Sequence, residues 1–240
     1  MPRTRARLLW PAVFTCVAAA ILVSLGVWQL HRLGWKEALI DAIETRANAA
    51  PQPLPPIADW PRLRPEDYEY RHVKAAGTFE HDKETLVFRA SGGIAGEQPG
   101  YHVLTPLRLT SGGYVIVNRG FVPLDRKGQS SRRAGLILGE TEITGLMRQP
   151  EARNFFTPAD DPSVGTYFTR DPGLLAKLFG LDPAAPFSID ADAMELPGGW
   201  PKGGATGRDL PNNHLSYALT WFGLAIALIG VFTAFAWQKR

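Results

Sequence analysis

The sequence contains one cysteine, Cys16, among its 240 residues. A single thiol cannot form an intrachain disulfide, and it cannot supply a C-x-x-C metal or redox pair or a C-x-x-C-H haem-attachment motif. The sequence also lacks H-E-x-x-H and G-x-S-x-G, and its glycine-rich stretch at 198–207 does not have the spacing of a phosphate loop. These absences argue against metalloprotease, serine hydrolase and nucleotide-binding chemistry, so we expect no enzyme.

Charged residues are missing from two long segments. Residues 8–30 and 215–237 each run for 23 residues without Asp, Glu, Lys or Arg. An α-helix rises ~1.5 Å per residue, so each segment spans about 34 Å, enough to cross a hydrocarbon core of roughly 30 Å. Neither segment has the polar stripe of an amphipathic helix. We therefore expect a membrane protein with transmembrane helices at 8–30 and 212–237 that flank a domain at 31–211.

A cleaved signal peptide is the alternative interpretation of the first segment. Such a peptide has an apolar core of ~7–15 residues followed by a small-residue cleavage site. The segment here is longer and ends in WQLHR, and cleavage after residues 18–20 would cut it in the middle. Its length favours an uncleaved anchor, and a mature N-terminus near Ile21 would contradict this prediction.

The flanking charges predict the orientation of the helices. No acidic residue lies outside 31–214, whereas five cations do: Arg3, Arg5, Arg7, Lys239 and Arg240. The positive-inside rule then places both termini in the cytoplasm. The basic pI of 9.1 follows from these tails and does not indicate a nucleic-acid partner. Only seven residues precede the first segment, which we take to leave no room for a mitochondrial transit peptide. We expect a bacterial cytoplasmic (inner) membrane and a periplasmic central domain.

The central segment is predicted to be mostly β (α+β) and antiparallel. β-Branched and aromatic residues alternate with glycine-rich turns, which favours strands within 70–79, 85–90, 101–109, 114–121, 140–147 and 187–190. Residues 171–180 have the proline start and glycine end of a short helix. We further expect the first helix to continue to Ala47 and a proline-rich extended spacer at 50–61.

The central domain has polar side chains, but they do not form a convincing site. We interpret His72, His81 and His102 as surface or packing histidines, because they are scattered over different strands and turns. The best candidate cluster for an enzyme, formed by Asn118, Arg119 and Asp125, is more typical of a turn-stabilising set.

Polar and aromatic residues gather instead where the two apolar segments would meet the outer face of the membrane. Polar groups at that depth are costly and therefore informative. Helical spacing places Trp28 and Arg32 on one face of the first helix, and His214, Tyr217 and Trp221 on one face of the second. If the faces oppose each other, they enclose an intramembrane pocket with an imidazole suited to haem iron and a cation suited to a propionate.

Interfacial anchoring is the alternative for this cluster. Tryptophan and tyrosine are enriched at membrane interfaces, and arginine extends toward water there, which accounts for Trp28 and Tyr217 without a binding site. Interfacial anchoring explains His214 less well. Gly223–Ala227 and Gly230–Ala234 have a small-xxx-small spacing that would allow close helix approach.

Two motifs at these helices resemble a known family. The segments LG-x-WQ-x-x-R-x-x-WK, residues 25–36, and NNH-x-x-YA-x-TWFG, residues 212–223, are similar to the membrane signatures of the surfeit locus protein one (Shy-one-like) family. GYHVLTPL at 100–107 and VNRGFVP at 117–123 resemble its outer-domain blocks, with Phe121 where we would expect tryptophan.

The resemblance implies an assembly factor for the haem–copper cytochrome c oxidase of the respiratory chain. It implies haem a as bound cargo, His214 as the axial ligand of its iron, and the oxidase large subunit as partner, with haem a synthase as a further candidate. The full candidate site comprises His214, Tyr217, Trp221, Trp28, Gln29 and Arg32. The alternative function is a haem-independent membrane scaffold that holds an oxidase subunit during assembly. The sequence leaves the oligomeric state open.

Overall fold

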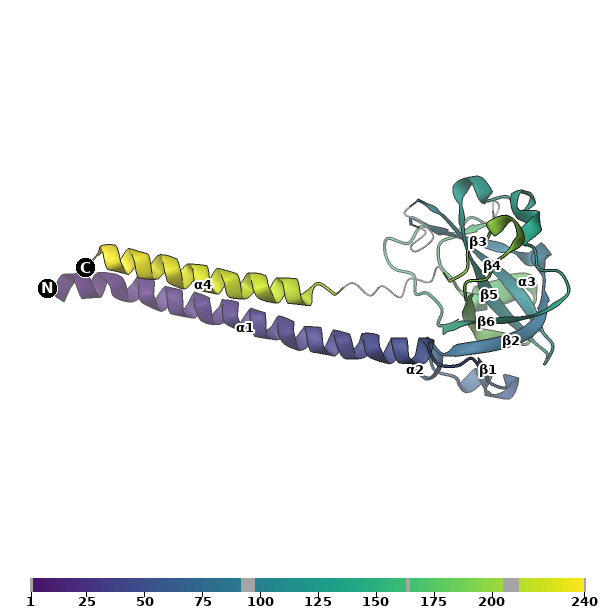
Figure 1. Cartoon of the computed structure of the whole chain (residues 1–240), viewed down its shortest axis with the longest axis horizontal. Coiled ribbons are helices and arrows are strands. Elements are labelled where there is room, and N and C mark those ends of the chain that lie inside the picture. Colours follow the sequence, from purple (N-terminus) through teal and green to yellow (C-terminus); the bar gives the residue numbers. More distant parts are fainter. Residues whose placement is uncertain (1, 92–97, 163–164, 205–211, 240) are drawn as a thin grey trace. The chain divides into compact units, whose positions relative to one another are not determined.

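The computed structural model describes residues 2–91, 98–162, 165–204 and 212–239, with side chains from residue 8 onward. The chain divides into two compact units, Met1–Ala42 with Asp209–Arg240, and Ile43–Arg208. The first unit is helical and the second is built mainly from strands (Figure 1). The described chain thus contains two apolar helices near its ends and a β-rich domain.

The helical unit consists of most of α1 (Pro2–Ala47) and all of α4 (His214–Gln238). Both helices are long and apolar enough to cross a membrane, judged by length and composition. The predicted continuation of the first helix to Ala47 is confirmed, because α1 runs to that residue without a break. Gly26 and Gln29 of α1 contact Phe222 and His214 of α4 respectively, so the two helices are antiparallel (Figure 1).

The two helices approach each other where small side chains line the contact. A Cβ atom on Gly26 would lie 2.6 Å from the Phe222 ring, so α4 occupies the space that any larger residue would need. On α4, the packed positions are Ala218 and Ala225, which are 1% and 3% exposed. The prediction that Gly223–Ala227 and Gly230–Ala234 mediate the approach is wrong, since Gly223 and Gly230 are exposed.

The β unit contains a barrel-like sheet whose strand order is β1-β2-β6-β8-β5-β4-β3-β7. Its strands are β1 (Gln52–Pro53), β2 (His72–Phe79), β3 (Thr85–Arg89), β4 (Gly100–Leu109), β5 (Tyr114–Pro123), β6 (Glu140–Arg148), β7 (Thr166–Tyr167) and β8 (Ala184–Ala191). An additional β2–β4 pairing joins the two sides of the sheet, with Gly77 opposite Leu109. The six predicted strands are therefore confirmed, and β2, β6, β8, β5 and β4 close a ring.

Most strand pairs are antiparallel, as predicted, but β1–β2, β3–β7 and β5–β8 are parallel. A parallel pair needs a crossover connection, and the long segment between β5 and β8 supplies one that includes α3 (Pro172–Phe179). The sequence indicates α3 correctly: the Asp171 side chain accepts a hydrogen bond from Leu174 N at 3.0 Å, and Gly180 ends the helix in the left-handed conformation.

The two larger of three apolar clusters among the described residues hold most of the β unit together. The first fills the ring of strands and contains Val73, Leu107, Val117 and Phe187, each almost completely buried. The second lies under α3, where Leu175 packs with Val87, Leu104 and Ile116. Burial of side chains of this size stabilises a fold by roughly 1.5–3 kcal/mol each relative to exposure.

The proline-rich segment 50–61 is only partly the extended spacer that was predicted. It forms β1 and then the first five residues of a 3-10 helix, Ile57–Arg62, which inserts Trp60 into the core. The Trp60 ring lies 6.0 Å from that of Phe187, and its indole N–H donates to the Pro55 carbonyl at 3.0 Å. Proline content alone could not reveal that one aromatic side chain makes this segment part of the fold.

The glycine-rich stretch at 198–207 pairs with the sheet where it is described. Lys202 pairs with Phe121 of β5 through two backbone hydrogen bonds of 2.9 Å. Gly120, with φ at +123°, allows this approach, because a Cβ there would lie 2.1 Å from the Lys202 carbonyl oxygen. Residues 205–207 lie outside the described residues.

Candidate functional site

A polar contact joins the two helices of the helical unit. The imidazole Nδ1 of His214 lies 2.8 Å from the side-chain Oε1 of Gln29. Gln29 is 9% exposed, and His214 is partly buried. Polar side chains packed between two apolar helices are costly unless they pair with one another, so this contact is the natural candidate for a functional position.

Helix geometry explains how the two side chains meet. Gln29 lies three residues after Gly26, so both occupy the face of α1 that contacts α4. On α4, His214, Ala218 and Phe222 follow one another at four-residue steps along one stripe. The glycine and the alanine therefore bring the helices close enough for the amide of Gln29 to reach the imidazole.

His214 is also the first residue of α4. The backbone N–H of His214 donates a weak hydrogen bond of 3.4 Å to the side-chain oxygen of Asn212. Asn213 is the N-cap residue, and its side chain makes no capping hydrogen bond. The position of the imidazole is therefore set by the start of a helix and by its contact with Gln29. The first constraint belongs to α4 itself, and the second comes from α1.

The other predicted site residues are placed differently. Trp28 and Tyr217 are 53% and 56% exposed on the helix surfaces, and Trp221 is partly buried. Arg32 is exposed, and its guanidinium carbon lies 5.2 Å from the centre of the Trp35 ring. Within the described helices, Gln29 is the predicted residue that meets His214 directly, whereas the side chains of Trp28 and Arg32 face outward.

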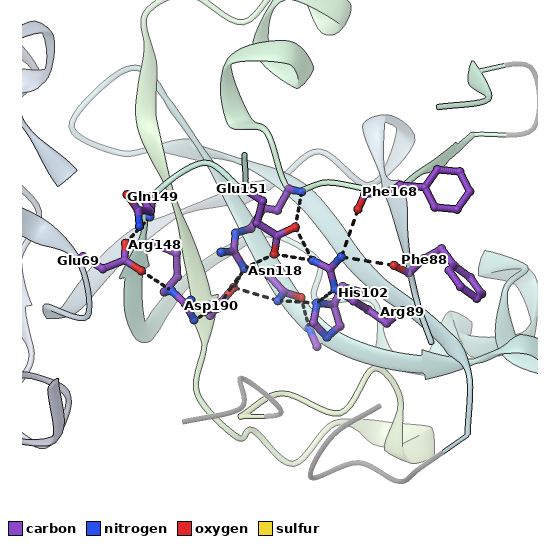
Figure 2. A network of polar contacts seen from close by, with 12 residues as sticks. Glu69, Phe88, Arg89, His102, Asn118, Arg148, Gln149, Glu151, Phe168 and Asp190 are labelled. Atoms are coloured by element: carbon purple, nitrogen blue, oxygen red, sulfur yellow. Dashed lines mark hydrogen bonds and ion pairs between the residues drawn. The ribbon is translucent and has the colours of Figure 1, made fainter. Parts of the chain in front are cut away.

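The β unit contains a second, larger polar cluster that the sequence did not indicate. Its centre is Asp190 on β8, which is 2% exposed (Figure 2). The Asp190 carboxylate accepts hydrogen bonds from Asn118 at 2.9 Å, Arg148 at 3.1 Å and Arg170 at 3.2 Å. These donors lie on β5, at the end of β6 and directly before α3, so the carboxylate ties together separate parts of the unit.

Two further carboxylates complete this cluster. Both carboxylate oxygens of Glu151 accept from Nη2 of Arg89, at 2.6 and 2.8 Å, and one of them also accepts from the backbone N–H of Arg170. Glu69 accepts from Nε of Arg148 at 3.0 Å. Each carboxylate of the cluster thus contacts a guanidinium group, which is the arrangement that buried charges require.

The cluster shifts the pKa values of its members. Burial would raise the pKa of Asp190, but the guanidinium groups of Arg170 and Arg148 hold it below its usual value. Burial and the neighbouring Arg89 cation lower the pKa of His102 from 6.5 to about 4. His102 is therefore neutral near pH 7, and its Nδ1 can accept from Arg89 Nε at 3.3 Å.

A cleft of about 480 Å³ opens beside this cluster, lined in part by Tyr70, Arg148 and Arg170. Tyr70 adopts a φ of +62°, a strained conformation for a residue with a side chain, and the Arg148 guanidinium lies 4.6 Å above its ring. Strained positions often accompany binding sites. The balanced charges around the cleft do not favour a ligand of one sign.

The loop between β6 and β7 borders the cleft and exposes two aromatic rings, Phe155 and Phe156, which are 95% and 87% exposed. Local hydrogen bonds hold the turn at residues 154–157: Asn154 Oδ1 accepts from Phe156 N at 2.9 Å, and Thr157 Oγ1 accepts from Asn154 N at 3.0 Å. Exposed aromatic residues on such a loop are typical of contact surfaces.

The three histidines of the β unit make separate packing contacts, as the sequence suggested. His72 lies 2.8 Å from Asp192, His81 lies 2.8 Å from the Ile137 carbonyl oxygen, and His102 belongs to the cluster around Asp190. Within the ranges that the structure describes, no group of three or more His, Cys, Asp or Glu side chains could hold a metal ion.

The interpretation of Asn118, Arg119 and Asp125 as one turn-stabilising set is wrong. Asn118 binds Asp190, whereas Arg119 donates to the Gly135 carbonyl. The side chain of Asp125 is 75% exposed and lies 3.7 Å from Arg126. The three residues were grouped because they are close in the sequence. Successive side chains of a strand point to opposite faces of the sheet, so Asn118 and Arg119 of β5 face different surroundings. A charged residue within an otherwise apolar strand, as in FSID, was the signal that could have pointed to Asp190.

Comparison with known proteins now identifies the chain's relatives. A family model described as the SURF1 family matches residues 16–226, a range that includes both Gln29 and His214. The chain belongs to the SURF1 family. This SURF1 family member is 36% identical to surfeit locus protein 1 of Mus musculus over 239 residues, which covers 95% of this chain and 74% of the relative.

Two further relatives agree with this assignment. The chain is 37% identical to surfeit locus protein 1 of Homo sapiens over 229 residues, covering 90% of the chain and 72% of the relative. It is 33% identical to surfeit locus protein 1 of Takifugu rubripes over 240 residues, covering 95% of each protein. The resemblance seen in the two helix motifs is thus confirmed for this SURF1 family member.

Proposed function

We propose that this chain is a non-catalytic assembly factor for haem–copper cytochrome c oxidase, which binds haem a as cargo and assists its insertion into the large subunit. The support is membership of the SURF1 family, whose proteins are known as cytochrome oxidase assembly factors, together with the imidazole placed between two apolar helices. The contact between His214 and Gln29 is the observation that carries the haem part of the proposal.

The proposed setting is a bacterial cytoplasmic membrane with both termini in the cytoplasm and the β unit in the periplasm. The two apolar helices and the basic residues at both chain ends support this arrangement. In this setting the large subunit of the oxidase is the partner, and haem a synthase is the candidate donor of the cargo. The lipid bilayer surrounds the exposed apolar faces of α1 and α4.

The donor set at the helix contact fits a haem. Haem iron is bound by a neutral imidazole nitrogen, and no described residue pairs with Nε2 of His214. Trp28, Tyr217 and Trp221 supply aromatic surface on the same two helices for a flat macrocycle. Arg32 lies one helical turn from Trp28 and supplies a cation for a propionate group. In this proposal all six predicted residues take part, and His214 provides the bond to iron.

A visible spectrum tests the proposal. The full-length protein and His214→Ala are purified in detergent from cells that make haem a, and the haem bound per protein is measured. His31→Ala is the matched control, because His31 is an exposed histidine of α1. We expect His214→Ala to lose most of the haem and His31→Ala to retain it. Equal haem content in the parent and His214→Ala would overturn the assignment.

The exposed Phe155 and Phe156 rings favour a second candidate, a haem-independent scaffold that holds an oxidase subunit. The test is co-purification of the large subunit from cells that cannot make haem a. A scaffold captures the subunit without haem and loses it when both phenylalanines are replaced by serine. A haem carrier without scaffold activity captures the subunit only when haem a is present.

A further inference from the structure

We infer that Gln29 is a positioning residue that fixes the tautomer of His214, with the proton on Nδ1 and the lone pair on Nε2. The inference about the tautomer stands on the helix contact alone. Its consequence for iron binding rests on the proposed function, because it concerns the same imidazole.

The two contacting atoms differ in whether they can donate a hydrogen bond. The Oε1 atom of Gln29 is a carbonyl oxygen, which accepts hydrogen bonds and cannot donate them. It lies 2.8 Å from Nδ1 of His214, a distance typical of a hydrogen bond. The Nδ1 atom must therefore carry the proton. A neutral imidazole has a single N–H group, so Nε2 is left with an available lone pair.

The packing of the helices holds this arrangement in place. Gln29 is 9% exposed, so water has little access to its amide oxygen, which would lose a partner if the proton moved to Nε2. Gly26, one turn before Gln29, fixes the spacing of the helices through its contact with Phe222. Free histidine in water prefers the opposite tautomer, with the proton on Nε2. The contact therefore imposes a state that the side chain would not adopt by itself.

The remaining nitrogen is placed to act as a ligand. No described residue pairs with Nε2 of His214, so its lone pair is not used within the described part of the helix pair. A hydrogen bond from Nδ1–H to an acceptor orients an imidazole ring and raises the basicity of the other nitrogen, which is how second partners support metal-binding histidines. Gln29 supplies this acceptor without adding a negative charge between apolar helices, where a carboxylate would be costly.

The tautomer is measured in the haem-free protein. The full chain is labelled with ¹⁵N-histidine, reconstituted in lipid bilayers and observed by solid-state nuclear magnetic resonance, with assignment by His214→Ala. We expect a protonated Nδ1 and an unprotonated Nε2 in the neutral imidazole of His214. Gln29→Leu removes the acceptor, so the Nε2–H form becomes the major species. Leu30→Ala, at the neighbouring exposed position outside the candidate site, is the control and leaves the tautomer unchanged.

Two outcomes overturn the inference. One is a parent protein whose His214 carries its proton on Nε2. The other is a Gln29→Leu protein whose tautomer equals that of the parent. Gln29→Met is the second variant, because it removes the amide acceptor while keeping the length of the side chain, so the Nε2–H form becomes the major species even if the leucine variant assembles poorly.

A second measurement connects the tautomer with haem. We expect Gln29→Leu to lower haem affinity about 10–100-fold, the range seen when a second partner of a ligand is removed. In a His214→Ala background, the same substitution has no further effect. If the parent shows the Nδ1–H form but binds no haem a, the proposed function fails and the inference stands. If haem binding depends on His214 while the proton lies on Nε2, the inference fails and the proposed function stands.

Discussion

The helical unit and the β unit use their histidines in opposite ways. In the β unit, both ring nitrogens of His72 are engaged, with Nδ1 2.8 Å from the Ala49 carbonyl oxygen and Nε2 2.8 Å from Asp192. In the helical unit, His214 uses Nδ1 for Gln29, while no described residue forms a hydrogen bond with Nε2. A histidine whose two ring nitrogens are both hydrogen-bonded stabilises the fold. A histidine between apolar helices with one ring nitrogen not hydrogen-bonded is available to a ligand.

Like the ring nitrogens of His72, the charged groups of the cluster around Asp190 have partners, because they are paired with one another. The carboxylates of the cluster each contact a guanidinium group and connect β5, β6, β8 and the segment before α3 (Figure 2). Substitutions in the β unit should therefore change stability, and substitutions at the helix contact should change ligand binding. The following predictions test that separation, in order of decreasing effect.

Asp190→Ala should have the largest effect on stability. It leaves the guanidinium groups of Arg148 and Arg170 buried without their shared carboxylate, a change that costs about 3–5 kcal/mol when a buried ion pair is broken. Chemical denaturation of the full chain in detergent, followed by near-ultraviolet circular dichroism, measures this loss. Asp125→Ala is the control, because its exposed pair contributes at most about 1 kcal/mol. A loss below that for Asp190→Ala would contradict the structural role of the cluster.

The stability of the β unit should fall as the pH is lowered from 6.5 toward 4. The pKa of His102 is about 4 in the folded protein, so the unfolded chain binds more protons than the native one throughout this window. The loss approaches about 3 kcal/mol, since each pKa unit corresponds to ~1.4 kcal/mol. The lowered pKa values of Asp190 and Glu151 add a loss at still lower pH.

Denaturation midpoints measured at several pH values check this dependence. His102→Gln should flatten the curve between pH 6.5 and 4, because an amide oxygen can still accept from Arg89 but does not titrate in this range. A curve with the same slope in the variant would show that another group is responsible.

Gly26→Ala should weaken the packing of the two helices. The added methyl group would lie 2.6 Å from the Phe222 ring, and overpacking of this kind costs about 1–3 kcal/mol. We expect lower thermal stability of the helical unit and reduced contact between Gln29 and His214. Phe222→Leu combined with Gly26→Ala should recover part of the loss, whereas Gly223→Ala, at an exposed position, should have little effect.

His72→Ala should destabilise the β unit by about 1–2 kcal/mol, since it removes two hydrogen bonds, one of them to a carboxylate. Thermal denaturation measures the change, with His31→Ala as the exposed control on α1. Haem content per folded protein should remain that of the parent. A selective loss of haem in His72→Ala would contradict the division of roles between the two units.

Arg32→Gln should have the smallest effect. The side chain is exposed and contacts Trp35, so we expect no measurable change in stability. In the proposed function it supports a propionate, and its loss should lower haem retention less than tenfold, far less than His214→Ala. Titration of haem into the purified variants compares the two. A complete loss of haem in Arg32→Gln would assign it a more central role.

The sequence predicted elements that depend on local patterns. Uninterrupted apolar segments predicted α1 and α4, and alternating β-branched residues predicted the strands of the β unit, because these patterns follow directly from helix and strand geometry. Trp60 was missed, since its burial depends on Phe187, which lies far away in the sequence. The parallel β5–β8 pair depends in the same way on a long connection.

The candidate site was predictable only in part. Helical spacing singled out His214, but it placed Trp28 and Arg32 on the facing surface, while the structure turns Gln29 toward the imidazole. The rotation of one helix against another depends on which small residue makes the close approach, here Gly26. The cluster around Asp190 was missed because its members come from distant segments and carry no motif.

Glu151 and Arg170 lie on either side of the segment that carries Phe155 and Phe156, and the Glu151 carboxylate accepts from the backbone N–H of Arg170 and from the Arg89 guanidinium group. Asn154 holds the turn between them by accepting from Phe156 N, and both phenylalanine rings are exposed. This apolar surface stays in contact with water unless another molecule covers it. We expect the purified protein to self-associate through it at low detergent, and a soluble version to need polar residues at these two positions.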